Sequence, residues 1–376
     1  MDWNRYYIFS DCIDIVCIEE LSHYTQINKD ANLLTKSYVN LFYNCNNYTF
    51  EHICFYISIT CLVQAISQFI YFSARSIFIY FAFGSKPCMS TFDPNQFKEG
   101  QRQGWNNVAD GWLKWWNITE TAGKSLTKRL IELAGIKQGS KILDIATGIG
   151  EPSITAAQLV GENGHVLAID ISPQMLAVAK QRSISMGLQD VMDFREGDAE
   201  TINLPSSTFD AALCRFGLMF LPNVKAGLSN IHNSLVNDGI FAAAVWASPD
   251  KVPFISLPFN VLLKETNSPP PPMNAPGPFS LSDEKLLKEY INSSGFKDVT
   301  IERQDMIFNF KSAEEFTNFV CETASPVQVI LSKQSEERRK KLLQAITEAA
   351  VNSNVDKNSG SISFSNEVIC IVGTKQ

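Results

Sequence analysis

The sequence lacks the cysteine and histidine spacing that metal-binding proteins use. Its nine cysteines form no C-x-x-C pair, and only four histidines are spread over 376 residues. A zinc site is therefore not expected. Basic residues are also in the minority, because 32 Lys and Arg stand against 39 Asp and Glu, giving a net charge of −7. This balance argues against a nucleic-acid partner, which usually requires a basic face.

Only one dense basic run is present, at residues 338–341, and it directly precedes an apolar helical pattern. We interpret it as the solvated face of a helix rather than as a phosphate-binding site. The chain is 45% hydrophobic, which is enough for one large domain or two ordinary ones.

Charged residues are missing from a long stretch near the N-terminus. Residues 53–74 contain none, and a helix of that length spans about 33 Å, enough to cross a bilayer of about 30 Å. One interpretation is a membrane segment within residues 53–83, with the C-terminal body of the chain anchored and facing the cytosol because basic residues follow the segment. The alternative is that residues 1–88 are a hydrophobic extension ahead of a true start at Met89, which leaves a cytoplasmic main body.

From residue 136 onward, short apolar runs alternate with helical segments. We expect strands at residues 141–146, 165–171, within 192–199, 209–218, 240–247, 298–310 and 361–375. Such a rhythm is typical of a doubly wound, Rossmann-like α/β sheet. Ligands bind such sheets beyond the carboxyl ends of the strands.

Helices are expected between these strands. The segments are residues 151–160, 172–187, 224–236, 281–294 and 312–354. Ser172 and Pro173 are typical of an N-cap and a first helical position. Six prolines within residues 267–279 predict a stiff, extended loop on the rim of the fold.

Four tryptophans gather in residues 105–117, a segment with helical spacing. Trp105, Trp112 and Trp116 fall near one face, which predicts a core stripe. The alternative is a lid whose aromatic rings touch a ligand. We assign residues 89–135 to an N-terminal helical lid and residues 136–376 to the main domain.

The stretch "LDIATGIGEP", residues 143–152, gives the strongest indication of a ligand site. Ala146, Gly148 and Gly150 follow a strand and allow a ligand to approach the backbone closely. Asp144 would repel a phosphate and attract an ammonium group, so a ligand with an amino-acid end suits the turn better than a dinucleotide does.

Further acids and apolar residues follow the next two strands. Asp170, at the end of the second strand, is suited to accept both hydroxyls of a ribose. Asp198, after the third strand, is suited to accept a hydrogen bond from an exocyclic amine, and Ile171 and Met175 supply apolar surface. An amino acid, a ribose and an adenine together make S-adenosylmethionine.

Residues 141–250 resemble the class I S-adenosylmethionine-dependent methyltransferases, most of all the ubiquinone/menaquinone-biosynthesis C-methyltransferase group. The stretches that carry the resemblance are "LDIATGIGEP", "IDISPQML", "EGDAETINLPSSTFDAALCRFGLMFLP" and "LVNDG". It implies that Gly148 and Gly150 border the methionine moiety and that Asp170 binds the ribose. It also implies that Asp198 and Ala199 meet the adenine and that Arg215 lies at the methionine end.

The resemblance further implies seven strands with the last one antiparallel. The helical insertion at about residues 312–354 would then cap the pocket, lined by Phe316, Phe319, Val320 and Val327 or simply packed through them. The quinone enzymes carry an arginine-asparagine pair where this chain has Met219 and Phe220. This departure leaves the cofactor assignment intact and puts a quinone acceptor in doubt.

The sequence therefore predicts an S-adenosylmethionine-dependent methyltransferase acting on a small, lipophilic acceptor. No catalytic base is assigned, because the two histidines of the main domain, His165 and His232, lie where a strand begins and inside a helix. Two alternatives are an NAD-dependent oxidoreductase and a non-catalytic module that keeps the cofactor pocket.

Overall fold

In a computed structural model, the described residues are 92–270, 272, 275–354 and 359–376. They belong to one compact unit, Ser90–Gln376. The expectations for residues 1–88 lie outside the described residues. Among the described residues, no helix is long and apolar enough to cross a membrane.

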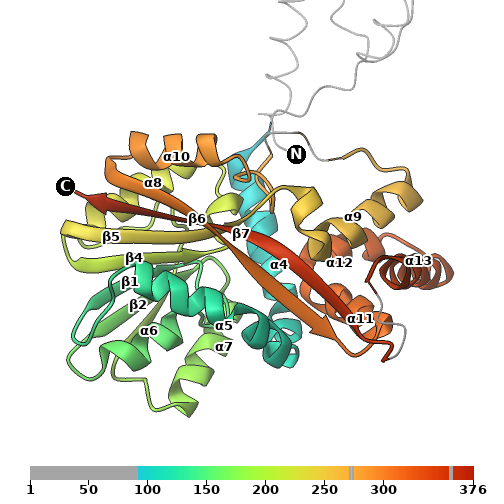
Figure 1. The fold of residues 1–376 in the computed structure, drawn as a ribbon, viewed down its shortest axis with the longest axis horizontal. Helices are drawn as coiled ribbons and strands as arrows, with labels where there is room; N and C mark the ends of the chain where they lie inside the picture. The colour runs from blue at the N-terminus through green and yellow to red at the C-terminus, as the bar shows by residue number, and fades with distance from the viewer. Residues whose placement is uncertain (1–91, 271, 273–274, 355–358) are drawn as a thin grey trace, which may run out of the picture. The chain divides into compact units, whose positions relative to one another are not determined.

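The core of the fold is a seven-stranded sheet with the order β3-β2-β1-β4-β5-β7-β6 (Figure 1). The strands are β1 (Lys141–Ile145), β2 (His165–Asp170), β3 (Met192–Glu196), β4 (Phe209–Arg215), β5 (Leu235–Trp246), β6 (Phe296–Phe310) and β7 (Ile362–Lys375). The pairings among β1 to β5 are parallel, whereas β7 runs antiparallel to both of its neighbours. The predicted Rossmann-like sheet with an antiparallel last strand is confirmed.

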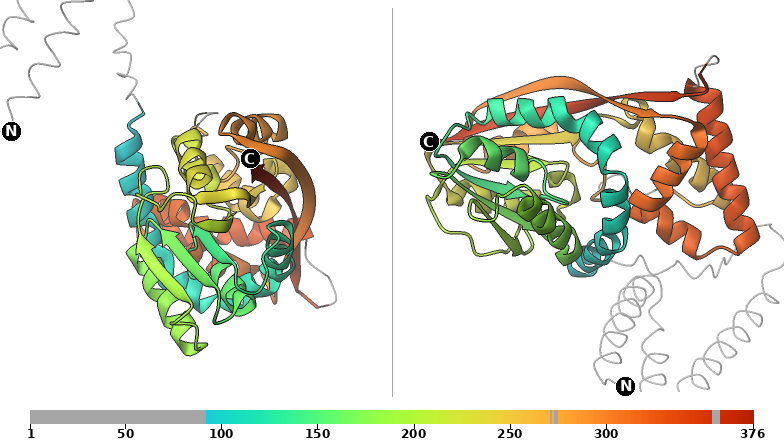
Figure 2. Two further views of the ribbon diagram at one scale, coloured as in Figure 1. Left: turned by 90° about the vertical axis from the view of Figure 1, so that its left-hand side faces the viewer. Right: turned by 90° about the horizontal axis from the view of Figure 1, so that it is seen from below.

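Helices cover both faces of this sheet (Figures 1 and 2). On one face lie α5 (Trp116–Leu133), α6 (Ser153–Val160) and α7 (Pro173–Ser185), and on the other α8 (Val224–Ser234) and α10 (Glu284–Ser293). Helix α7 begins as expected, because the Ser172 side chain accepts a hydrogen bond from the backbone N–H of Met175 at 3.1 Å. Helix α4 (Pro94–Lys114) contacts both α7 and the cap helices described next.

Three helices pack together at one end of the sheet and form a cap. They are α11 (Ala313–Thr323), α12 (Ser325–Ser332) and α13 (Glu336–Asn354), and they are inserted between β6 and β7, as predicted for residues 312–354. Residues 362–367 of β7 pair with β6 alone and form a two-stranded ribbon that reaches these helices (Figure 2). From Val368 onward, β7 also pairs with β5.

Three elements differ from the sequence-based expectation. Helix α6 begins at Ser153, because Glu151 and Pro152 still belong to the preceding turn. Strand β5 begins at Leu235 rather than at the expected residue 240, and its pairing with β4 is irregular between Leu235 and Ile240.

The third difference is a helix that the sequence analysis missed, α9 (Pro253–Thr266). Pro253 stands at its first turn, where no N–H is lost, but Pro258 lies in the interior, a position that usually breaks a helix. Pro258 and Leu262 are buried, and α9 packs against α13 and β7. Tertiary packing here outweighs the local preference.

Phenylalanine rings from β6, β7 and α11 form the core of the cap. Phe316 and Phe319 are 0% and 2% exposed. The Phe316 ring centroid lies 4.6 Å from that of Phe364 and 5.2 Å from that of Phe310, and Phe319 lies 5.3 Å from Phe310. These residues, with the buried Val320 and Val327, hold the cap together by packing.

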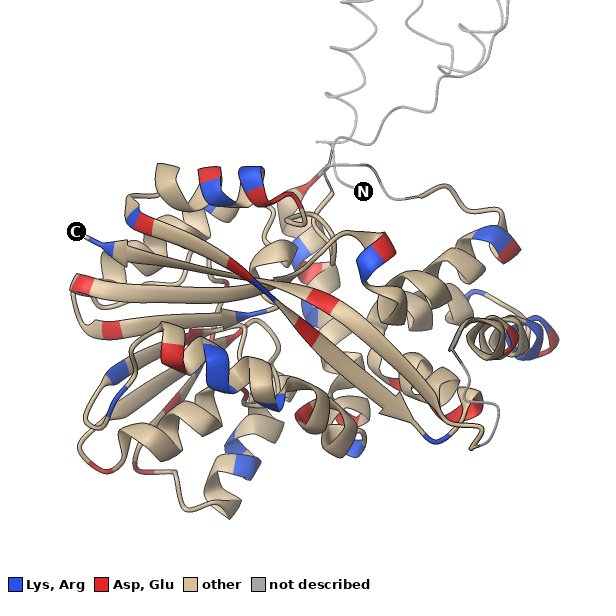
Figure 3. Ribbon diagram, viewed as in Figure 1, with Lys and Arg blue, Asp and Glu red and all other residues tan. Residues whose placement is uncertain are grey.

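The basic run at residues 338–341 lies in the first turns of α13, where acidic and basic residues follow one another at the edge of the cap (Figure 3). Lys340 pairs with Glu336 at 2.9 Å and Lys341 with Glu337 at 2.7 Å, one helical turn apart. The interpretation as a solvated helix face is confirmed.

We expect Phe316→Ala to lower the free energy of unfolding by about 3–5 kcal/mol, because it leaves a ring-sized cavity in the cap. Urea denaturation measures this change. Ile307→Ala on β6 is the matched control, since Ile307 is 48% exposed and its truncation should change stability by less than about 0.5 kcal/mol. Equal losses in both variants would contradict the assignment of Phe316 to the cap core.

Candidate cofactor pocket

A pocket opens at the carboxyl ends of β1 to β4, between the sheet and helices α4 and α5. Strand ends, the turns after them and the two helices all contribute. The side chains and backbone that line it include Lys98, Trp105, Trp112, Trp116, Ala146, Gly148, Glu151, Asp170, Ile171, Met175, Asp198, Ala199, Arg215, Phe216 and Phe220. This is the edge at which doubly wound sheets bind their ligands.

Eight of the ten site residues predicted from the sequence line this one pocket. They are Ala146, Gly148, Asp170, Ile171, Met175, Asp198, Ala199 and Arg215. Asp144 and Gly150 do not line it. The four cap residues Phe316, Phe319, Val320 and Val327 do not line it either, so of the two interpretations given for them plain helix packing holds.

The turn after β1 exposes its backbone to the pocket. Ala146 and Gly148 both adopt left-handed backbone angles, with φ of 57° and 58°. Gly148 faces open space, because a Cβ added there would meet no atom within 4 Å. Ala146 fits in place of a glycine because residue 217 has no side chain, and a Cβ at Gly217 would lie 2.4 Å from that of Ala146.

Gly150 and Asp144 face the protein interior. A Cβ on Gly150 would lie 2.7 Å from Cδ1 of Ile154, so the missing side chain makes room for α6 rather than for a ligand. Asp144 is fully buried and accepts a hydrogen bond from the Ser153 hydroxyl at 2.6 Å. Burial raises the pKa of Asp144 to about 7, and its Oδ1 has no hydrogen-bond partner among the described residues.

Asp170 ties two turns together at the pocket wall. Its Oδ2 accepts the N–H of Gly148 and its Oδ1 accepts the N–H of Ser172, each at 2.8 Å. The residue is 7% exposed, and burial raises the pKa of its carboxyl group to about 6 even though these backbone hydrogen bonds lower it. Each carboxylate oxygen keeps a second lone pair for a ligand.

Three tryptophans form the wall opposite the strand ends. Trp105, Trp112 and Trp116 are half-buried on α4 and α5 and pack against the small cluster that contains Met175. The Trp105 ring meets Phe220 edge-on, with centroids 5.5 Å apart. The predicted core stripe therefore also lines the pocket.

Charged groups gather at the inner end of the pocket. Arg215 donates from Nη1 to the Thr127 hydroxyl at 2.7 Å, and Glu151 lies 3.4 Å from Arg182. The Arg182 guanidinium stacks on the Trp116 ring at 3.4 Å from its centroid. Burial lowers the pKa of Arg215, and the nearby carboxylates of Glu151 and Asp144 oppose this change.

The acid that reaches the pocket at this end is Glu151, which the sequence analysis missed. It directly follows the turn at residues 146–150 and is 5% exposed. Lys98 was missed as well, because no local pattern links a residue of α4 to the loop after β3. The order of residues along a turn locates the turn but does not give the direction of each side chain.

These residues fit S-adenosylmethionine, a zwitterionic amino acid joined to a nucleoside. The left-handed turn leaves an open cradle at Gly148, and two carboxylates with free lone pairs line the wall. Ile171, Met175 and Ala199 add the apolar surface that a purine requires.

Comparison with known proteins finds methyltransferases among the relatives of this chain. Residues 142–239 match the family described as "Methyltransferase domain". The ubiquinone/menaquinone biosynthesis C-methyltransferase of Cellvibrio japonicus is 30% identical over 175 residues, which cover 44% of this chain and 70% of that protein. The corresponding enzyme of Azotobacter vinelandii is 28% identical over 179 residues, covering 45% and 71%.

A solved structure with a similar chain is the phosphoethanolamine N-methyltransferase 2 of Haemonchus contortus, in complex with phosphomonomethylethanolamine and S-adenosylhomocysteine. It is 16% identical, with a TM-score of 0.46 over 74% of this chain and 60% of that one. On the sequence matches and the fold together, the chain belongs to the class I S-adenosylmethionine-dependent methyltransferases.

Proposed function

We propose that this methyltransferase binds its cofactor along the strand ends and transfers a methyl group to a small, lipophilic acceptor. Asp170 accepts the two ribose hydroxyls, and Asp198 with Ala199 meets the adenine. The single observation that carries this proposal is the Asp170 carboxylate, which lines the pocket and already holds the bare turn at Gly148.

We assign the amino-acid end of the cofactor to Glu151 and Arg215. Both line the inner end of the pocket, where an acid faces the ammonium group and a guanidinium faces the carboxylate. Asp144, which the sequence suggested for the ammonium group, is fully buried and bonded to Ser153. Its role is then to hold the start of α6 against the turn.

The bound cofactor supplies an electrophilic methyl group on a sulfonium. The residues of this chain contribute alignment and exclusion of water, since a displacement at carbon depends on the distance and angle of approach. Trp105, Trp112 and Phe220 provide the apolar wall for this purpose. We assign no proton-transfer role to any residue.

A lipophilic acceptor is supported by the composition of that wall and by the relatives. The curated relatives are named for ubiquinone and menaquinone biosynthesis. In place of the polar pair that the quinone enzymes carry, this chain has the buried Met219 and the pocket-lining Phe220. We therefore expect an acceptor as apolar as a quinone precursor but with different polar substituents.

The function is tested with S-adenosylmethionine labelled in its methyl group and an extract of cells that express the protein. We expect label to enter the organic-solvent phase in proportion to the protein added. Heat-denatured protein is the control. Label that enters only the protein or nucleic-acid fraction would contradict a lipophilic acceptor, and no transfer at all would favour the non-catalytic alternative.

Asp170→Asn should weaken the binding of S-adenosylhomocysteine at least tenfold, because a hydrogen bond to a charged carboxylate contributes about 1.5–3 kcal/mol. Isothermal titration calorimetry at pH 7.5 measures this loss. Asp193→Asn is the matched control, since that carboxylate on β3 is exposed and pairs with His165 at 3.1 Å. The ribose assignment would be contradicted if both substitutions weakened binding equally, or if neither changed it, in variants that melt near the wild-type temperature.

Affinity for S-adenosylhomocysteine should fall as the pH is lowered through 6. The pKa of Asp170 is about 6, so at pH 5 most molecules carry a neutral carboxyl and the dissociation constant rises about tenfold relative to pH 7.5. Calorimetry at several pH values tests this. The Asp170→Asn variant should show no such step, and a step that persists in this variant would assign the titration to another group.

Protonation of Asp170 and of its buried neighbour Asp144 does not itself destabilise the fold. Burial raises the pKa values of Asp144 and Asp170, to about 7 and about 6, above the usual value of 3.8. The folded chain therefore holds these two protons more tightly than the unfolded chain does. The two groups add stability as the pH falls from 7 to 5.

A further inference from the structure

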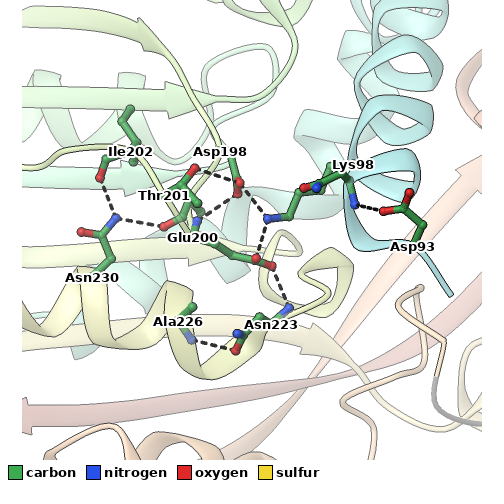
Figure 4. A network of polar contacts seen from close by, with 11 residues as sticks. Asp93, Lys98, Asp198, Glu200, Thr201, Ile202, Asn223, Ala226 and Asn230 are labelled. Atoms are coloured by element: carbon green, nitrogen blue, oxygen red, sulfur yellow. Dashed lines mark hydrogen bonds and ion pairs between the residues drawn. The ribbon is translucent and has the colours of Figure 1, made fainter. Parts of the chain in front are cut away.

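A lysine from α4 joins two acids that follow β3 (Figure 4). Lys98 Nζ donates to Asp198 Oδ2 at 2.8 Å and to Glu200 Oε2 at 2.5 Å. The Lys98 side chain is only 16% exposed and that of Glu200 only 6%. Lys98 and Asp198 both line the pocket, so this ion-pair cluster belongs to the wall at the adenine end.

The cluster fixes the orientation of the Asp198 carboxylate. Its Oδ2 accepts from Lys98 and from the Thr201 hydroxyl at 3.0 Å, while its Oδ1 accepts the N–H of Glu200 at 2.9 Å. A carboxylate has about four lone-pair positions. Three are therefore occupied by the protein, and the fourth, on Oδ1, remains for a donor in the pocket.

Glu200 extends the same cluster to a third segment. Its Oε1 accepts the backbone N–H of Asn223 at 2.7 Å, next to the pocket-lining Leu221 and Pro222 (Figure 4). Asn223 in turn caps α8 through the N–H of Ala226. Helix α4, the loop after β3 and the loop before α8 are thus held in one arrangement around the adenine end.

Charge explains why a cation is needed at this position. Asp198 and Glu200 bond to one ammonium group, and removing it would leave two partly buried carboxylates facing each other. Breaking such a pair from one side is more costly than breaking an exposed pair, because the remaining charges stay desolvated. Burial lowers the pKa of Lys98, but its bonds to both acids outweigh that effect and raise it.

We infer that Lys98 is a positioning residue that holds the Asp198 carboxylate oriented toward the 6-amino group of the cofactor's adenine. An ionised carboxylate can only accept hydrogen bonds, so it binds a 6-amino purine and repels the carbonyl oxygen of a 6-oxo purine. Part of the base specificity would then come from α4, outside the matched residues 142–239. This inference rests on the proposed adenine site at Asp198.

The test compares S-adenosylhomocysteine with S-inosylhomocysteine, which carries an oxygen in place of the 6-amino group. We expect the wild-type protein to prefer the adenosyl ligand by at least about tenfold, the effect of one charge-assisted hydrogen bond. In Lys98→Met the preference should fall below about threefold, chiefly through weaker adenosyl binding. Lys98→Arg, which keeps the charge and its donors, should restore most of it.

Lys114→Met is the matched control on the same helix. Lys114 is exposed, forms an ion pair of 2.7 Å with Glu322, and does not line the pocket. This substitution should leave both affinities and their ratio unchanged. If Lys98→Met does not fold, Lys98→Gln, which is neutral but keeps an amide NH2 donor group, should show the same fall in preference.

Several outcomes would overturn the inference. An equal weakening of both ligands would assign Lys98 a structural role only, and an unchanged preference in Lys98→Met would exclude any role in base recognition. A wild-type protein that binds S-adenosylhomocysteine without preference over the inosyl ligand would show that Asp198 does not meet the base. Failure of the wild type to bind either ligand would instead overturn the proposed function and this inference with it.

Discussion

The arrangement of the pocket depends on one buried carboxylate. Asp170 accepts the backbone N–H of Gly148 from the turn after β1 and that of Ser172 from the start of α7. It thereby holds two neighbouring strand ends in register and keeps a left-handed turn open toward the ligand. The same burial that raises its pKa also strengthens any hydrogen bond that a ligand donates to it. The carboxylate that holds the two turns is thus the same group to which we assign the ribose.

The sequence predicted the sheet well because each strand is a short apolar run between clear helix and turn signals. Strands β1 to β4 and the cap at Ser172 follow local rules. Helix α9 was missed because an interior Pro258 opposes helix formation, whereas its packing against α13 and β7 stabilises it. Long-range packing of this kind leaves no periodic signal in the chain.

The site was predictable where it follows from strand order and not where it follows from side-chain direction. Asp170 and Asp198 come after successive parallel strands, so the topology brings them to one edge. Asp144 also ends such a strand but turns inward to Ser153, and Glu151 takes its place at the pocket. Lys98 reaches the pocket from 100 residues away, which no spacing rule anticipates.

The pocket has two sources within the chain, and this division has a consequence for specificity. Residues 142–239, which match the methyltransferase family, supply the turns and acids that suit the cofactor, and this match sets aside the oxidoreductase alternative. Helices α4 and α5 supply the tryptophans and Lys98 from outside that range. We infer that Trp105 and Trp112, which lie outside residues 142–239, form with Phe220 the wall that meets the acceptor. Substitutions in α4 would then alter the choice of acceptor while the strand ends stay the same.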